Sequence, residues 1–104
     1  MAKLNRKYHI GELAGLQKEE ILKSVSMETV YPGVYFVTVS SNPAEQLDIV
    51  TSERYFSKKN ENRMEIVGIA YGKREAFILV RDIADEVYRK KTAGSMREYF
   101  GQHG

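Results

Sequence analysis

Residues 64–91, with the sequence MEIVGIAYGKREAFILVRDIADEVYRKK, join a buried strand, a glycine turn and an amphipathic helix in one stretch. The apolar run at 66–70 is rich in β-branched side chains, which is typical of a strand covered on both faces. Gly72 allows an abrupt turn, and from Lys73 the apolar residues recur with helical spacing. We therefore predict a strand at 64–71 and a helix at 73–91 that packs against it.

Simple alternation along this strand would divide its side chains into Val67, Ile69 and Tyr71 on one face and Ile66, Gly68 and Ala70 on the other. The second face is nearly flat, so a helix could approach it closely. On the helix, the predicted apolar stripe consists of Ala76, Val80, Ile83, Ala84 and Val87, with Phe77 and Tyr88 at its edge.

Ile78 departs from this pattern because it falls on the polar side of the predicted helix, beside Asp82 and Asp85. It is either an ordinary exposed residue or part of a contact surface for a partner or a second copy of the chain. The two aspartates are neighbours on the helix and could do acid–base chemistry if desolvated. Their basic neighbours favour a solvated charged surface instead.

The middle of the chain predicts further elements. Aromatic and β-branched residues at 34–40 predict a strand, and Tyr31-Pro32-Gly33 before it has the order of a type II turn. Asn42-Pro43-Ala44-Glu45 resembles a capping box, which favours a helix at 43–54 over a strand formed by the residues LDIVT. A helix at 17–25, extended backwards by Leu13 and Leu16, and a short strand at 27–31 are also expected.

Together these elements predict an α/β fold, with α+β as the alternative. The expected architecture is a small two-layer sandwich with a β-α-β-α core at residues 34–91, in which the crossover makes the two strands parallel. One or two further short strands must come from the first 31 residues, the C-terminal tail or another chain. We expect a single domain over residues 1–104, with residues 1–7 and 101–104 flexible.

The composition of the chain excludes several kinds of functional site. The chain has no cysteine, which excludes disulfides, zinc–thiolate sites and thiol nucleophiles. Its two histidines, His9 and His103, stand far apart and outside any metal-ligand spacing, so neither a metal nor a cofactor is predicted, and an enzyme is not expected. No apolar run approaches a membrane span or a signal peptide, which makes the cytoplasm the expected location.

Three groups of residues are candidate contacts. Gly72, Lys73 and Arg74 combine a strand end, helix amides and two cations, as an anion site would, although turn chemistry is the favoured explanation of this segment. Tyr55, Lys58 and Lys59 belong to the one stretch that interleaves basic and aromatic residues, a pattern found in nucleic-acid contacts. Met96, Tyr99 and Phe100 either complete the core or dock onto another chain.

The segment VGIAYGKREAFILVRDI, residues 67–83, resembles a stretch in short uncharacterised proteins of clostridia and related Gram-positive bacteria, some of them encoded on conjugative elements. The resemblance covers about a quarter of the chain. It implies a bacterial cytoplasmic setting and brings no activity, cofactor or site residues with it.

We therefore expect a non-catalytic protein-interaction module that associates with itself or with another protein. The candidate interface consists of Ile78, Met96, Tyr99 and Phe100. A nucleic-acid-binding accessory protein of a mobile element is the alternative. Its binding would be weak, because the net charge of +2 is only mildly basic. A small-anion or small-ligand binder at the Gly72 turn is a further alternative.

Overall fold

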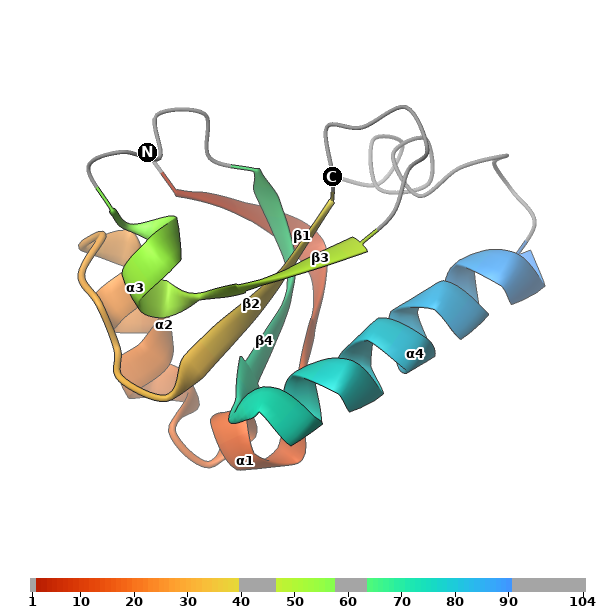
Figure 1. Cartoon of the computed structure of the whole chain (residues 1–104), viewed down its shortest axis with the longest axis horizontal. Helices are drawn as coiled ribbons and strands as arrows, with labels where there is room; N and C mark the ends of the chain where they lie inside the picture. The colour runs from red at the N-terminus through yellow and green to blue at the C-terminus, as the bar shows by residue number, and fades with distance from the viewer. Residues whose placement is uncertain (1, 40–46, 58–63, 91–104) are drawn as a thin grey trace.

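The computed structural model describes residues 2–39, 47–57 and 64–90. In these ranges the chain forms four strands and four helices, which confirms the α/β class (Figure 1). Their order is β1 (Lys3–Ile10), α1 (Glu12–Gly15), α2 (Lys18–Ser26), β2 (Val34–Val39), β3 (Leu47–Thr51), α3 (Ser52–Tyr55), β4 (Glu65–Tyr71) and α4 (Lys73–Lys90).

The strands form one mixed sheet in the order β1-β4-β2-β3. β1 is parallel to β4, whereas β2 is antiparallel to both β4 and β3. The expected parallel crossover between residues 34–40 and 64–71 is therefore wrong. The cause lies in residues 47–51, which form a strand paired with β2, from Tyr35 opposite Thr51 to Val39 opposite Leu47, where a helix over 43–54 was predicted.

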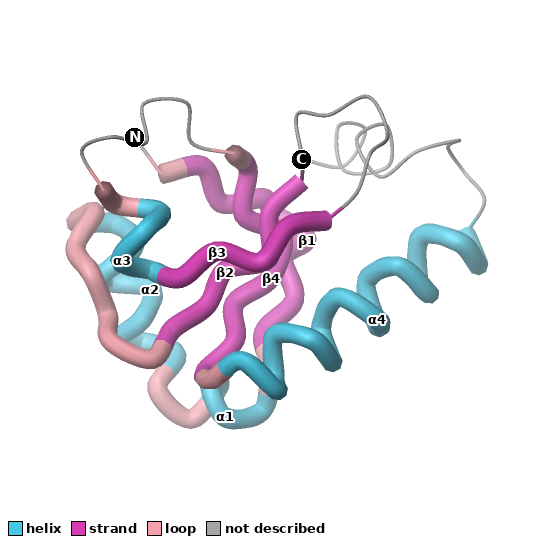
Figure 2. Tube along the Cα trace, viewed as in Figure 1, coloured by secondary structure: helices cyan, strands magenta, loops and turns pink. Residues whose placement is uncertain are grey.

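Helices cover both faces of this sheet, so the fold has three layers where two were expected. α4 lies along one face, and α2 and α3 lie on the other (Figure 2). Each face therefore has its own apolar cluster. Val37, Val39 and Val67 pack under α4, whereas Phe36 and Ile69 face the side of α2 and α3.

β4 does not alternate simply, and the predicted division of its side chains is wrong. Ile66 and Ile69 lie on the α2 face, while Val67 and Ala70 lie on the α4 face. The pairing with β2 shifts by one residue at Val67, which marks a β-bulge. A bulge inserts one unpaired residue and so reverses the faces that follow it. Gly68 nevertheless faces a helix closely, as the flat face predicted, with its ideal Cβ position 3.2 Å from Ile83 Cδ1.

β1 replaces the flexible N-terminus that was expected at residues 1–7. It supplies the strand that the first 31 residues were expected to contribute. Asn5 is buried, and its Oδ1 accepts a hydrogen bond of 2.8 Å from the amide of Lys7, so a polar side chain inside this strand is satisfied locally. Exposed Lys3, Arg6 and Lys7 give β1 the polar composition that concealed it.

Two predictions concern the segment between α2 and β2, and one of them is correct. The turn at Tyr31–Gly33 is confirmed, because Gly33 has a φ of 87° and the Val34 amide donates to the Tyr31 carbonyl at 3.1 Å. The strand predicted at 27–31 is wrong: Met27 caps α2, and Glu28 adopts a φ of 55°, which no extended strand allows.

The helices predicted at 17–25 and 73–91 are both present, as α2 and α4, but their apolar faces differ in part from the prediction. α4 buries Ala76, Leu79, Ile83 and Val87, so Leu79 takes a central place that the predicted stripe did not include. α2 buries Ile21 and Val25 as expected. Leu13 and Leu16 do not extend that apolar side. They lie in and after α1, exposed to solvent.

Candidate functional site

The carboxylate of Glu75 connects three elements at one end of the molecule. Its Oε1 accepts hydrogen bonds from the amides of Ala14 at 3.0 Å and Tyr71 at 2.9 Å, and its Oε2 accepts one from Leu13 at 2.7 Å. The side chain is buried. The start of α1, the end of β4 and the start of α4 are thus held together by one charged group, and charge-assisted hydrogen bonds of this kind are the stronger ones.

Local sequence explains why Glu75 is needed there. α1 begins after Gly11, which has no side chain to cap the free amides of the first turn. Gly11 also gives the carboxylate room, since a Cβ at this position would overlap the Glu75 side chain. The sequence alone shows only that Glu75 lies in the first turn of its own helix. The missing side-chain cap at Gly11 is the signal that could have indicated an acceptor from elsewhere in the chain.

The predicted anion site at Gly72 is not assembled as expected. Gly72 has a φ of 91°, as an abrupt turn requires, but its amide donates to the Gly33 carbonyl at 2.8 Å. That amide is therefore not available to an anion. Lys73 and Arg74 are exposed, and beside this turn the Tyr71 amide already donates to the Glu75 carboxylate. The geometry supports the turn interpretation.

The basic and aromatic stretch also differs from its prediction. Tyr55 is 1% exposed and packs edge-on against Phe36 and Phe56, with ring centroids 5.2 Å away in both pairs. Its hydroxyl donates to the Met64 carbonyl at 2.7 Å. A ring used in this way cannot stack on a nucleobase, so Tyr55 is corrected from a candidate contact to a core residue. Lys58 and Lys59 lie outside the described residues.

Asp82 and Asp85 belong to the solvated face of α4, as the basic neighbours predicted. Both side chains are about half exposed, and Asp85 Oδ2 lies 3.0 Å from Arg89 Nε. Across a shallow hollow, His9 Nε2 approaches Glu86 Oε2 at 3.4 Å. In the described ranges, no three histidine, aspartate or glutamate side chains group as metal ligands would.

Large apolar side chains are exposed at the end that Glu75 holds together. Ile78, on the first turns of α4, is 41% exposed, and Leu16, at the end of α1, is 82% exposed. Three more exposed apolar residues lie on α1, on α4 and at the end of β4 that precedes α4. We call the full set the α1–α4 surface: Leu13, Leu16, Tyr71, Phe77 and Ile78.

Charged groups of both signs accompany the α1–α4 surface. Glu12 is exposed at the start of α1, and Lys73 and Arg74 are exposed at the start of α4. Of the residues predicted as an interface, only Ile78 belongs to it in this structure. Met96, Tyr99 and Phe100 lie outside the described residues.

Comparison of the chain with protein-family models, curated proteins and solved structures finds no match. None of the helices in the described ranges is long and apolar enough to cross a membrane. The candidate function is therefore argued from the geometry of this chain.

Proposed function

We propose that this chain is a non-catalytic, self-associating module that binds a second copy of itself through the α1–α4 surface. The observation that carries the proposal is the exposure of Leu16 and Ile78 on two elements fixed beside each other by Glu75. Several large apolar side chains on adjoining elements are more than the single exposed residues common on monomers. The sequence predicts that this association takes place in a bacterial cytoplasm.

A second copy suits the surface because the surface carries both signs of charge. In a two-fold dimer each copy presents the same surface to the other. Glu12 of one copy can then meet Lys73 or Arg74 of the other while the apolar residues are buried. A specific dimer of this kind buries roughly 800 Å² per partner.

Sedimentation of the full chain over a range of concentrations tests the proposal. We expect the wild type to form dimers as concentration rises, and Leu16→Asp and Ile78→Asp to stay monomeric because each would bury an unpaired carboxylate. Circular dichroism should show that both variants remain folded, since neither side chain belongs to an apolar core.

The matched control is Met27→Asp, which changes an exposed apolar residue just after α2, outside the α1–α4 surface, and should dimerise like the wild type. Phe100→Asp separates the contribution of the C-terminal residues predicted as an interface. A wild type that stays monomeric at its highest attainable concentration would refute self-association, and Ile78 would then be an ordinary exposed residue.

A further inference from the structure

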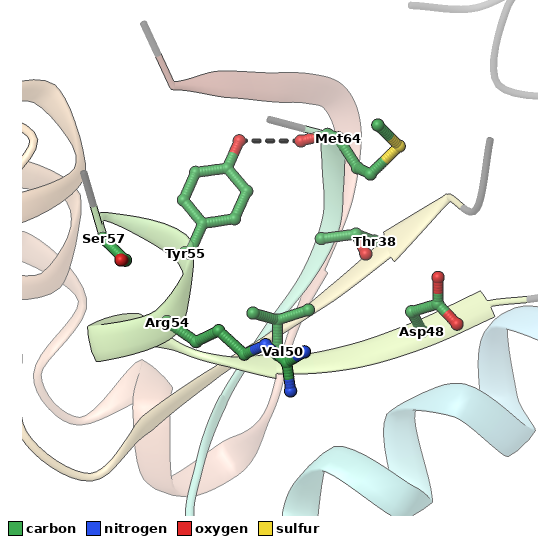
Figure 3. A pocket seen from close by; sticks show the side chains of 7 residues that line it. All are labelled: Thr38, Asp48, Val50, Arg54, Tyr55, Ser57 and Met64. Carbon is green, nitrogen blue, oxygen red and sulfur yellow. Dashed lines mark hydrogen bonds between the residues drawn. The ribbon is translucent and has the colours of Figure 1, made fainter. Parts of the chain in front are cut away.

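A hollow opens on the sheet face opposite α4, beyond the part that α3 covers (Figure 3). Its volume is about 420 Å³, which lies in the range of small-molecule sites. Two cross-strand pairs of β2 and β3, Thr38–Asp48 and Phe36–Val50, place three of its residues on this face. The full lining consists of Thr38, Asp48, Val50, Arg54, Tyr55, Ser57 and Met64.

The hydroxyl of Thr38 is the unusual group in this hollow. Thr38 is 1% exposed, and in the described part of the chain its Oγ1 has no hydrogen-bond partner. The neighbouring Tyr55 hydroxyl, by contrast, donates to the Met64 carbonyl and accepts from the Lys3 amide. A buried hydroxyl without a partner lowers stability, and valine would fill the same space without that cost. Among the described residues, the hydroxyl therefore has a hydrogen-bonding position left over for a molecule in the hollow.

Opposite charges stand at the rim. Asp48 comes from β3 and Arg54 from α3, and Figure 3 shows their side chains entering the hollow from different elements. Both residues are exposed, so both side chains remain in contact with solvent. Val50 and Met64 add apolar walls between these polar groups. The hollow thus combines apolar walls with a few convergent polar groups, as ligand sites do.

We infer that this hollow binds a small zwitterionic molecule of the amino-acid class. Its cationic group pairs with the Asp48 carboxylate, its anionic group with the Arg54 guanidinium, and a polar atom between them hydrogen-bonds to Thr38 Oγ1. This site is separate from the α1–α4 surface, because its residues come from β2, β3, α3 and the start of β4. Its test is therefore independent of self-association.

Thermal unfolding and titration calorimetry of the full chain provide the test. The probes are the twenty amino acids together with 4-aminobutyrate and 6-aminohexanoate, whose charges lie farther apart. We expect at least one probe to raise the unfolding temperature. Asp48→Asn and Arg54→Gln should each weaken its binding about tenfold, as the loss of a charge-assisted hydrogen bond implies.

Thr38→Val should weaken the same binding while leaving the ligand-free protein at least as stable as the wild type. Glu53→Gln, which removes an exposed charge on α3 outside the lining, is the matched control and should bind like the wild type. The inference is overturned if no probe shifts the wild type, if Glu53→Gln weakens binding as much as Asp48→Asn, or if Thr38→Val lowers the ligand-free unfolding temperature.

Discussion

Gly68 lies on the face of β4 that packs against α4. An ideal Cβ at this position would be 3.1 Å from Val37 Cβ and 3.2 Å from Ile83 Cδ1, tighter than ordinary van der Waals contact. Gly15, at the end of α1, differs sharply, because its Cβ would meet nothing within 4 Å. The two positions thus separate the effect of adding atoms from the effect of losing a glycine.

Gly68→Val should lower the free energy of unfolding by about 1–3 kcal/mol, because the added atoms push α4 away from the sheet. Urea unfolding curves give the measurement. Gly15→Val is the control and should leave the midpoint close to that of the wild type, since valine suits a helix slightly better than glycine. Equal midpoints for Gly68→Val and the wild type would show that the two layers are not packed this closely.

The boundary between β3 and α3 is set by the side chain of Thr51. β3 ends at Thr51 and α3 begins at Ser52, with Thr51 Oγ1 accepting a hydrogen bond of 3.1 Å from the Arg54 amide. Thr51 is therefore a helix N-cap. In the helix predicted over 43–54 it would have been an interior residue with an unfavourable helix propensity.

Thr51→Ala distinguishes these two arrangements by the sign of its effect. Loss of the cap should destabilise the protein by about 1 kcal/mol. In a continuous helix the same substitution would be stabilising, because alanine is the better helix former. Chemical denaturation of the two proteins gives the sign, with Ser57→Ala as a control just beyond α3.

Glu75 also determines how elements are held together, since its carboxylate joins α1, β4 and α4. Glu75→Gln removes the charge and turns one acceptor oxygen into an NH₂ group that faces a backbone amide. We expect a loss of about 1.5–3 kcal/mol, the cost of hydrogen bonds to a charged group. Hydrogen exchange at the Leu13 and Ala14 amides should also accelerate.

Glu20→Gln is the matched control for this experiment, because Glu20 is an exposed carboxylate on α2, outside the α1–α4 surface, and should change neither stability nor exchange appreciably. If Glu75→Gln exchanged and unfolded like the wild type, the carboxylate would not hold these elements together.

Elements were predictable where local and long-range preferences agree. The strand ending at Tyr71 and the helix from Lys73 were correct, because periodicity, turn chemistry and charge all favour them. The capping-box pattern at Asn42 was misleading, since pairing with β2 decides the structure of residues 47–51. The first residues of β1 were not predicted as a strand, because the exposed ones are basic. The bulge at Val67 was not predicted either, because no pattern within a single strand reveals it.

The candidate sites were less accessible to sequence reasoning than the elements. Ile78 was found because it breaks the periodicity of its own helix. The partners of the Glu75 carboxylate lie as far as 62 positions away along the chain, and Thr38 becomes unusual only when its burial and missing partner are known. Tyr55 looked like a contact residue in its stretch, but its ring fills the space beside Phe36.

The order of the strands in the sheet differs from their order along the sequence. β1 comes first in the chain but lies at the end of the strand order, where its neighbour among the four described strands is β4. The two pair in parallel, with Lys3 opposite Glu65, so β1 depends on residues that follow it by about 60 positions. β2 and β3, in contrast, are antiparallel and close in sequence.

This arrangement has a consequence for how the protein is made. A ribosome adds about 5–20 residues per second, so roughly 3–12 s pass between the emergence of β1 and that of β4. During this interval the first strand has no neighbour to pair with, and nascent chains on the same messenger are close by. The positive charges of Lys3, Arg6 and Lys7 keep such strands apart. We therefore expect these three exposed residues to reduce association of the chain before it has folded.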